Sequence, residues 1–309
     1  PWNGLLVPSP VIFVVVAGIG CGLLTSTSQQ VSNTELRWLL IRRGTFLFTI
    51  GTMFEWVWNG TILPYYGIYF ILAAGVFHLK TKHIAMLAGA ITVAAALLSY
   101  WRYRQEVNGH STSWLQPFEP NTPRNFLFRY FIDYTHPVLP WFTFFCVGLI
   151  IGKSYTAFRL MRKTILFASI PALFCIYLAS GLALHHTDGS WQHLLSTDPF
   201  QRGILATVGA CTSAVLIVIL ISFLADKYST SPLAQLLQRS GQITLTLYLC
   251  HGFIYNAVVN WWNWVEPGGF TTAFIFSCVV WTLLIAVGVR WQTSIGKGPI
   301  EVVYRKFGN

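Results

Sequence analysis

Charged side chains are scarce in this chain. Only 10% of the 309 residues are Asp, Glu, Lys or Arg, whereas a soluble domain carries about 25%. So few charges cannot cover a water-facing surface, which excludes a soluble enzyme, a coiled coil and a disordered tail. The formal net charge is +10, but nucleic-acid binding needs a basic patch on a water-exposed face. The composition leaves little such face, so we expect no nucleic-acid partner.

Familiar catalytic signatures and cysteine frameworks are also missing. The sequence has no Gly-rich phosphate loop, no H-E-x-x-H and no Ser nucleophile elbow. All six cysteines fall in apolar stretches without metal-ligand spacing, so we interpret them as buried hydrophobes rather than disulfides. A cluster of polar residues near position 190 suggests a metal, but nothing fixes its geometry, and we expect none. It consists of His185, His186, Asp188 and His193.

Long apolar runs, by contrast, are abundant. The mean hydropathy is +0.56 and 54% of residues are hydrophobic. A helix that crosses ~30 Å of hydrocarbon needs about 20 mostly apolar residues, and no strand alternation competes over these lengths. We therefore predict an all-α fold, a polytopic integral membrane helix bundle with nine spans. The spans lie at 5–24, 44–58, 62–79, 83–101, 137–152, 164–184, 203–225, 241–260 and 270–289.

Lys and Arg are divided unevenly between the two sets of connecting loops. Fifteen lie in one set, and only five lie in the other, which contains the long segments 102–136 and 185–202. Because cytoplasmic loops are rich in Lys and Arg, we predict a cytoplasmic C-terminus, with Pro1 and both long segments outside. A chain that starts outside without Met or a signal peptide suggests that a first span is missing. We therefore expect ten spans in the full protein.

Two ionisable residues within the apolar runs are candidates for function, because charge at membrane depth is costly. His251 lies midway along 241–260 and shares a polar stripe with Asn256 and Asn260. It is a candidate proton acceptor or substrate ligand, or else a hydrogen-bonded packing residue. Glu55 shares a helical face with Asn59, four residues on. It is a second candidate, unless it is a surface carboxylate just beyond the membrane.

Two polar residues stand just before the span at 137–152. Asp133 and His136 are three residues apart, and an aspartate in this position could orient the imidazole as a general base. The alternative is ordinary solvated loop polarity.

The cytoplasmic side carries clusters of basic residues. They suit the phosphates of a cytosolic donor, because Arg makes bidentate contacts to phosphate; the alternative is topology and contact with lipid headgroups. The candidates are Arg42, Arg43, Lys153 and Arg159.

Three motifs, in this order, resemble those of one family. Trp2-Asn3-Gly4-Leu5 leads into the first span, Gly241–His251 contains Leu-Thr-Leu-Tyr-Leu-Cys-His, and Gly298-Pro299-Ile300-Glu301 stands near the end. Together they resemble heparan-α-glucosaminide N-acetyltransferase and its bacterial relatives. The likeness spans almost the whole chain.

The resemblance implies a single transmembrane acyltransferase domain over 1–309, in a bacterial cytoplasmic membrane. It would move an acetyl group from cytosolic acetyl-CoA, without a metal, to a hydroxyl or amine of an extracytoplasmic sugar, glycan or glycolipid. The catalytic His of the family stands three residues before the Trp, which here falls before Pro1. Asn3 would help to place that His or the acyl carbonyl, and His251 would line the cavity. The residues facing the sugar would be Asp133, His136 and Glu55. The CoA phosphates would be held by Arg42, Arg43, Arg159 and Lys153.

Two other functions remain open. A transporter or flippase for a lipid-linked saccharide would use the same cavity without acyl transfer, although we find no inverted repeat and no matching pair of broken spans. A structural membrane subunit would tolerate His251→Ala without loss of function. The sequence also leaves a homodimer open.

Overall fold

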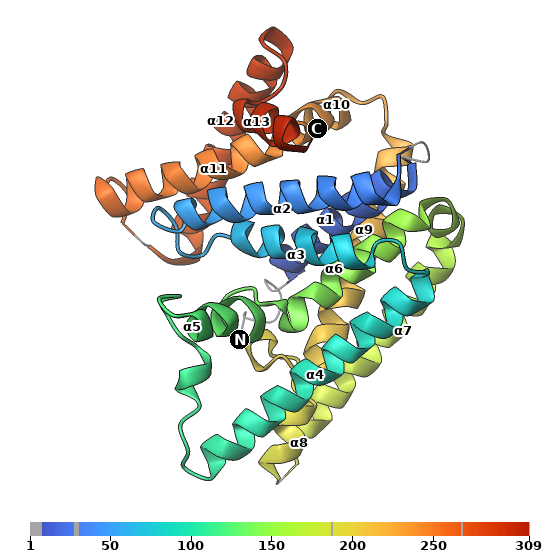
Figure 1. The fold of residues 1–309 in the computed structure, drawn as a ribbon, viewed down its shortest axis with the longest axis vertical. Coiled ribbons are helices and arrows are strands. Elements are labelled where there is room, and N and C mark those ends of the chain that lie inside the picture. Colours follow the sequence, from blue (N-terminus) through green and yellow to red (C-terminus); the bar gives the residue numbers. More distant parts are fainter. Residues whose placement is uncertain (1–7, 28–30, 187, 267, 309) are drawn as a thin grey trace. The chain divides into compact units, whose positions relative to one another are not determined.

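Every regular element in the part of the chain that the structure describes is helical (Figure 1). This computed structural model describes residues 8–27, 31–186, 188–266 and 268–308. The all-α prediction is confirmed. The longer helices are α1 (Pro8–Thr27), α2 (Asn33–Phe54), α3 (Leu63–Val76), α4 (Thr81–Val107), α6 (Val138–Lys153), α7 (Tyr155–Ala183), α9 (Ile204–Lys227), α11 (Thr244–Tyr255) and α12 (Gly269–Ser294). The shorter ones are η1 (Ser113–Leu115), α5 (Pro123–Leu127), η2 (Phe128–Ile132), α8 (Gly189–Leu194), η3 (Pro199–Gln201), α10 (Pro232–Gly241), η4 (Asn256–Trp261) and α13 (Pro299–Gly308).

Five helices are long and apolar enough to cross a membrane, namely α1, α4, α7, α9 and α12. The helices α3 and α6 are apolar but shorter. The protein is therefore a polytopic helical membrane protein, as predicted. Each of the nine predicted runs contains a helix, but nine spans as a number stays a prediction, because α2 and α11 are not in either apolar set.

Two helices depart from the predicted limits for local reasons. The helix α2 begins at Asn33, well before the apolar run, because Ser32 and Glu35 form a capping box: the Ser32 N–H donates to the Glu35 carboxylate (3.0 Å) and the Glu35 N–H to the Ser32 hydroxyl (3.2 Å). The helix α11 continues as the wider turn η4. There the Asn256 amide donates to the Gly252 carbonyl (3.1 Å) and accepts from Asn260 (2.7 Å). The two asparagines of the predicted polar stripe are thus bonded within their own helix.

The chain forms two compact units. Unit 1 contains the residues up to Trp38 and Ile68–Ser222, and unit 2 contains Leu39–Gly67 and the described residues from Phe223 onward. The helices α2, α3 and α9 each contribute residues to both.

In unit 1, α1 and α6 pack with their backbones in contact. Glycines four residues apart on each helix meet: Gly18 and Gly22 on α1, and Gly148 and Gly152 on α6. A Cβ on Gly148 would lie 2.0 Å from the Val15 carbonyl oxygen, and a Cβ on the other three would lie 2.2–2.6 Å from a carbonyl oxygen of the opposite helix. Such spacing is typical of membrane helices that approach closely. Residue numbers rise together along the contact, so the helices are parallel.

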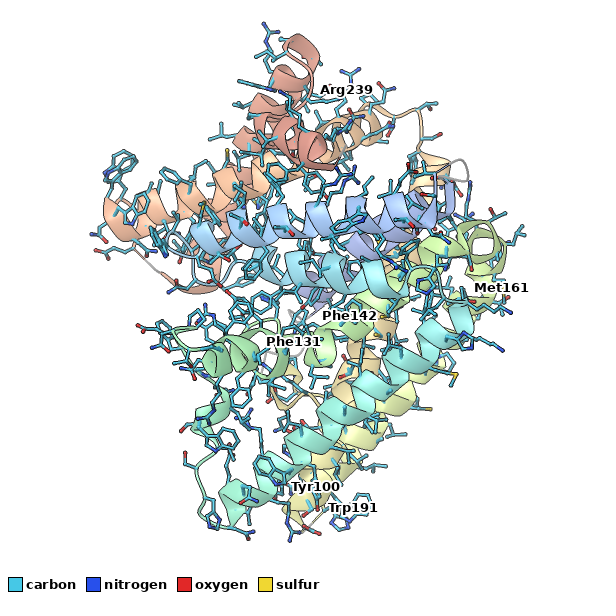
Figure 2. The ribbon with its side chains drawn as sticks, viewed as in Figure 1. Tyr100, Phe131, Phe142, Met161, Trp191 and Arg239 are labelled. Atoms are coloured by element: carbon cyan, nitrogen blue, oxygen red, sulfur yellow. The ribbon has the colours of Figure 1, made fainter. Side chains whose placement is uncertain are left out.

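The helix α4 packs on α6 through buried hydroxyls. Both Thr92 of α4 and Thr143 of α6 donate to the Ala88 carbonyl, at 2.9 and 3.1 Å. On α6, Phe142 (labelled in Figure 2) stacks on Phe145 with ring centroids 5.7 Å apart. The side chain of Lys153, at the end of α6, donates to the carbonyls of Phe77 and Leu79 just after α3. A cation is favoured there by the helix dipole.

In unit 2, α13 is fastened to the start of α11 by Glu301. Its buried carboxylate accepts from the Thr246 backbone N–H (2.9 Å) and from the Thr246 hydroxyl. The first N–H groups of a helix lack an intrahelical partner, and an anion is favoured there. A Cβ on Gly298 would lie 2.1 Å from Oε2 of this carboxylate. The second and third family-like motifs are therefore parts of one contact.

Candidate functional site

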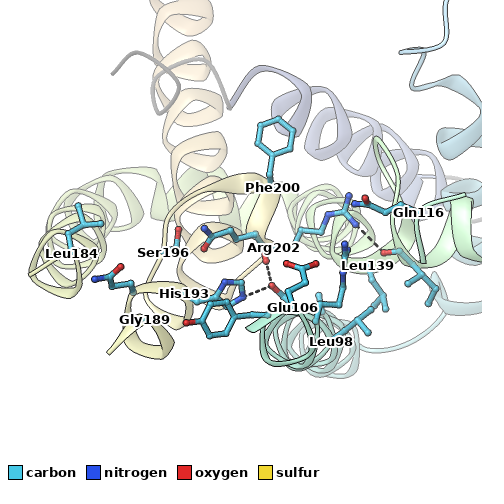
Figure 3. Close-up of a pocket in the computed structure, with 17 residues that line it drawn as sticks. Leu98, Glu106, Gln116, Leu139, Leu184, Gly189, His193, Ser196, Phe200 and Arg202 are labelled. Atoms are coloured by element: carbon cyan, nitrogen blue, oxygen red, sulfur yellow. Dashed lines mark hydrogen bonds between the residues drawn. The ribbon is translucent and has the colours of Figure 1, made fainter. Parts of the chain in front are cut away.

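A polar pocket of about 490 Å³ lies in unit 1, at the C-terminal end of α4. Figure 3 shows side chains from α4, from the two predicted outer segments and from the start of α6 around it. The helix α4 supplies one wall because residues 99, 102, 103 and 106 share one helical face. The polar lining consists of Ser99, Arg102, Tyr103, Glu106, Gln116, Gln192, His193, Ser196, Gln201 and Arg202.

Asp133 is the anionic centre beside this lining. Its carboxylate is only 2% exposed and forms ion pairs with Arg102 and Arg202. The Gln116 amide donates to the same carboxylate at 2.5 Å. Arg202 also donates to the Ile132 carbonyl at 3.1 Å. Because one buried carboxylate holds two guanidinium groups, the contact fixes both long segments against α4.

Glu106 balances the charge of the lining. It accepts from Thr112 (2.8 Å), whose hydroxyl in turn accepts from Nε of Arg102 (3.3 Å). Two arginines thus face two carboxylates. A charge-balanced lining rich in amides, hydroxyls and rings suits a neutral polyhydroxylated ligand better than a highly charged one.

A second hydrogen-bonded group lies on the same wall. The hydroxyl of Ser99 is 3.0 Å from Nε2 of His193 and donates to the Gln201 carbonyl. The ring of His193 stacks on Tyr103, with centroids 4.6 Å apart and planes 17° from parallel. Burial lowers the pKa of His193, whereas a hydrogen bond with the Ser99 backbone and the nearby Glu106 act in the opposite direction.

His136 stands beside the pocket, at the start of α6. Its carbonyl accepts from the Tyr69 hydroxyl, and its ring packs edge-on against Trp141 at 4.5 Å. Burial, and secondarily Arg202, lower the pKa of His136 to about 3. The imidazole is therefore neutral at physiological pH. The sequence suggested that Asp133 could orient this imidazole; in the structure its carboxylate binds the two arginines described above.

In unit 2, His251 lies within a cluster of aromatic rings. Trp58 and Tyr248 meet it edge-on, with centroids 5.2 and 5.0 Å from the imidazole, and Trp281 stacks on it at 5.1 Å. The Tyr248 hydroxyl contacts Thr61 and accepts from the Ile62 N–H (3.1 Å). Glu55, in the same unit, is 7% exposed. The alternative that Glu55 is an exposed surface carboxylate is therefore wrong.

The candidate phosphate ligands differ in their surroundings. Arg42 and Arg159 are exposed, whereas the Arg43 guanidinium lies over the ring of Tyr304, 5.2 Å from its centroid. Lys153 already binds the carbonyls after α3. Asn3 lies outside the described residues. Among the described residues, no group of three His, Cys, Asp or Glu side chains is placed to hold a metal.

Sequence reasoning missed Arg102, Arg202, Ser99 and Gln201, and it considered His193 only as a metal ligand. A signal for the arginines was present. Both belong to the five Lys and Arg of the predicted outer loops, where a cation is the exception to the orientation rule. Nothing in the sequence pointed to Ser99, one of several hydroxyl residues at helix ends.

The fold and the pocket define a polytopic helical membrane protein with a hydrogen-bonding cavity. Residues 3–185, more than half of the chain, match the family model described as heparan-alpha-glucosaminide N-acetyltransferase, catalytic, and the chain belongs to this family of membrane-bound acetyltransferases. Residues 153–308 match the model described as protein of unknown function (DUF418). Neither a curated protein nor a solved structure matches the chain significantly.

The family match confirms the resemblance predicted from the three motifs. Members of the family use acetyl-CoA as donor. The pocket draws on both matched regions, because Ser99 and Arg102 fall in the first and His193 and Arg202 in the second.

Proposed function

We propose that the protein transfers an acetyl group from cytosolic acetyl-CoA to a hydroxyl or amine of an extracytoplasmic sugar, glycan or glycolipid. The observation that carries this proposal is the charge-balanced polar pocket in a chain of this acetyltransferase family. Planar amide, guanidinium and carboxylate groups can bond to several hydroxyls of one sugar, and the exposed ring of Phe200 in the lining suits an apolar sugar face.

The proposed topology supports the direction of transfer. If all nine predicted runs span the membrane, both segments around the pocket lie outside and the C-terminus lies in the cytoplasm. In a bacterial cytoplasmic membrane, acetyl-CoA would then be available only on the face opposite the pocket. The exposed Arg42 and Arg159 and the half-buried Arg43 stay candidates for the CoA phosphates.

The other candidate residues have distinct proposed roles. Asp133 holds the two arginines of the pocket that would bind the sugar, and His136, beside this pocket, would face the same acceptor. In unit 2, the half-buried His251 and the buried Glu55 are candidates to line the path of the acyl group. Asn3 keeps the role that the family motif implies, which is to help to place the acyl carbonyl.

The test uses the full-length protein in proteoliposomes, with acetyl-CoA labelled in its acetyl group on the cytoplasmic face. Glucosamine on the opposite face serves as the probe, because it offers both hydroxyls and an amine. We expect labelled acetyl-glucosamine and free CoA in equal amounts. Liposomes without the protein are the control. Movement of the sugar across the membrane without CoA release would instead establish the transporter.

A further inference from the structure

Ser99, His193 and Gln201 form a hydrogen-bonded chain on the pocket wall (Figure 3). A carbonyl oxygen can only accept, so the single hydroxyl proton of Ser99 is donated to Gln201. The 3.0 Å contact between Ser99 and His193 must then be a donation from Nε2–H of the imidazole. A neutral imidazole has one N–H, so Nδ1 of His193 carries a lone pair and is the ring atom that can take up a proton.

The surroundings keep this imidazole neutral and its ring plane fixed. Stacking on Tyr103 holds the plane. Burial lowers the pKa of His193, so the base form predominates at neutral pH. The charged and titratable groups that share its pocket are Arg102, Tyr103 and Glu106 from α4 and Arg202 after η3.

A second observation points to a ligand at the same place. Oε1 of Gln201 is buried and has no hydrogen-bond partner among the described residues. Gln201 lines the pocket, and its backbone carbonyl accepts the hydrogen bond from the Ser99 hydroxyl. A buried oxygen without a donor is unfavourable. A hydroxyl or amine N–H on a bound ligand would supply that donor next to His193.

We propose that His193 is the general base on the sugar side of the reaction, with Ser99 as its positioning residue and Gln201 as a ligand for the reacting group. This inference rests on the proposed acetyl transfer. As the sugar oxygen or nitrogen bonds to the acetyl carbon, its proton moves to Nδ1 of His193. If acetyl-CoA is the direct donor, the bond between the acetyl carbon and the CoA sulfur breaks. If another histidine carries the acetyl group, the bond between the acetyl carbon and the nitrogen of that histidine breaks. The electron pair stays on the leaving atom, which takes a proton from the cytosol, and His193 releases its proton outside.

The test compares His193→Gln with the unchanged full-length protein in proteoliposomes, with glucosamine as the probe. Glutamine can still donate to Ser99 but cannot accept the proton. We expect kcat to fall about 100-fold, with the thermal shift caused by acetyl-CoA unchanged. We expect the unchanged protein to lose rate at acid pH, as His193 becomes protonated, and we expect this loss to be absent from the remaining activity of His193→Gln. His185→Gln is the matched control, because His185 is exposed in the same segment and does not line the pocket.

A second pair of variants covers the case in which His193→Gln fails to fold. Ser99→Ala removes the bond that fixes the imidazole proton and should lower kcat less than His193→Gln does, and Ser99→Thr should restore it. If His193→Gln transfers at the normal rate with the same acid limb, the inference is wrong and the proposed function stands. If the unchanged protein neither acetylates glucosamine nor releases CoA, both are wrong.

Discussion

At the scale of single residues, the pocket depends on one carboxylate that two arginines share. Breaking a buried ion pair by removing one partner typically costs 3–5 kcal/mol, because the remaining charges lose their compensation. Asp133 is almost wholly buried, and Arg102 and Arg202 are mostly so. The carboxylate therefore contributes more than a surface ion pair would.

We expect Asp133→Asn to lower the free energy of unfolding by about 3 kcal/mol. It should also abolish acetyl transfer to glucosamine, because both arginines lose their anchor. Denaturant titration in detergent micelles measures the first effect. Glu119→Gln, an exposed carboxylate in the same segment, should leave stability unchanged. Equal stability of the two variants would contradict the proposed role of the network.

His136 makes the stability of the fold depend on pH. Its pKa is about 3 in the folded protein, against about 6.5 when unfolded. Below pH 6.5 the unfolded chain binds a proton that the folded chain does not, so stability falls as the pH is lowered. The slope is about 1.4 kcal/mol per pH unit, or about 2 kcal/mol between pH 6.5 and 5.

The expected loss can be isolated with His136→Gln. Thermal unfolding of both proteins at pH 7.5 and pH 5 gives two differences, and the glutamine variant should lose about 2 kcal/mol less on acidification. Other groups titrate in both proteins and cancel in the comparison. An identical acid-induced loss in both would show that folding does not lower the pKa of His136.

At the scale of elements, the contact between α1 and α6 tolerates no side chain. A Cβ on Gly148 would meet a backbone oxygen, which cannot rotate away as a side chain can. We expect Gly148→Ala to destabilise the protein by about 2 kcal/mol. Gly20→Ala is the matched control, because a Cβ on Gly20 meets nothing within 4 Å, and alanine raises helix propensity by up to about 1 kcal/mol. Thermal unfolding that ranks the two variants the other way would refute the close packing.

At the scale of the whole molecule, hydropathy predicts the helical class and the place of every long helix, because in lipid a helix satisfies its own backbone. It misses the short helices α10 and α13, whose polar residues lower their mean hydropathy. A local signal for α10 was readable: Ser231 caps it by accepting from the Ala234 N–H (3.1 Å), with Pro232 at its first position.

The site was less predictable than the fold. Asp133 was found as a polar residue at the mouth of a span, but its partners Arg102 and Arg202 are separated by almost a third of the chain. No local periodicity links them, since only the packing of the helices in unit 1 brings them together. The same holds for Ser99 and His193. Sequence patterns identify buried polar groups one at a time, whereas pairing them requires tertiary structure.

The glycine contact also restricts how this protein can move. Each helix places two glycines against carbonyl oxygens of the other, four contacts in all, so a slip by one residue would drive side chains into carbonyl groups. The two helices are therefore locked in register and must move as one rigid rod. Conformational changes during the reaction can therefore tilt or rotate the pair of helices as a rigid body, but they cannot slide α1 along α6.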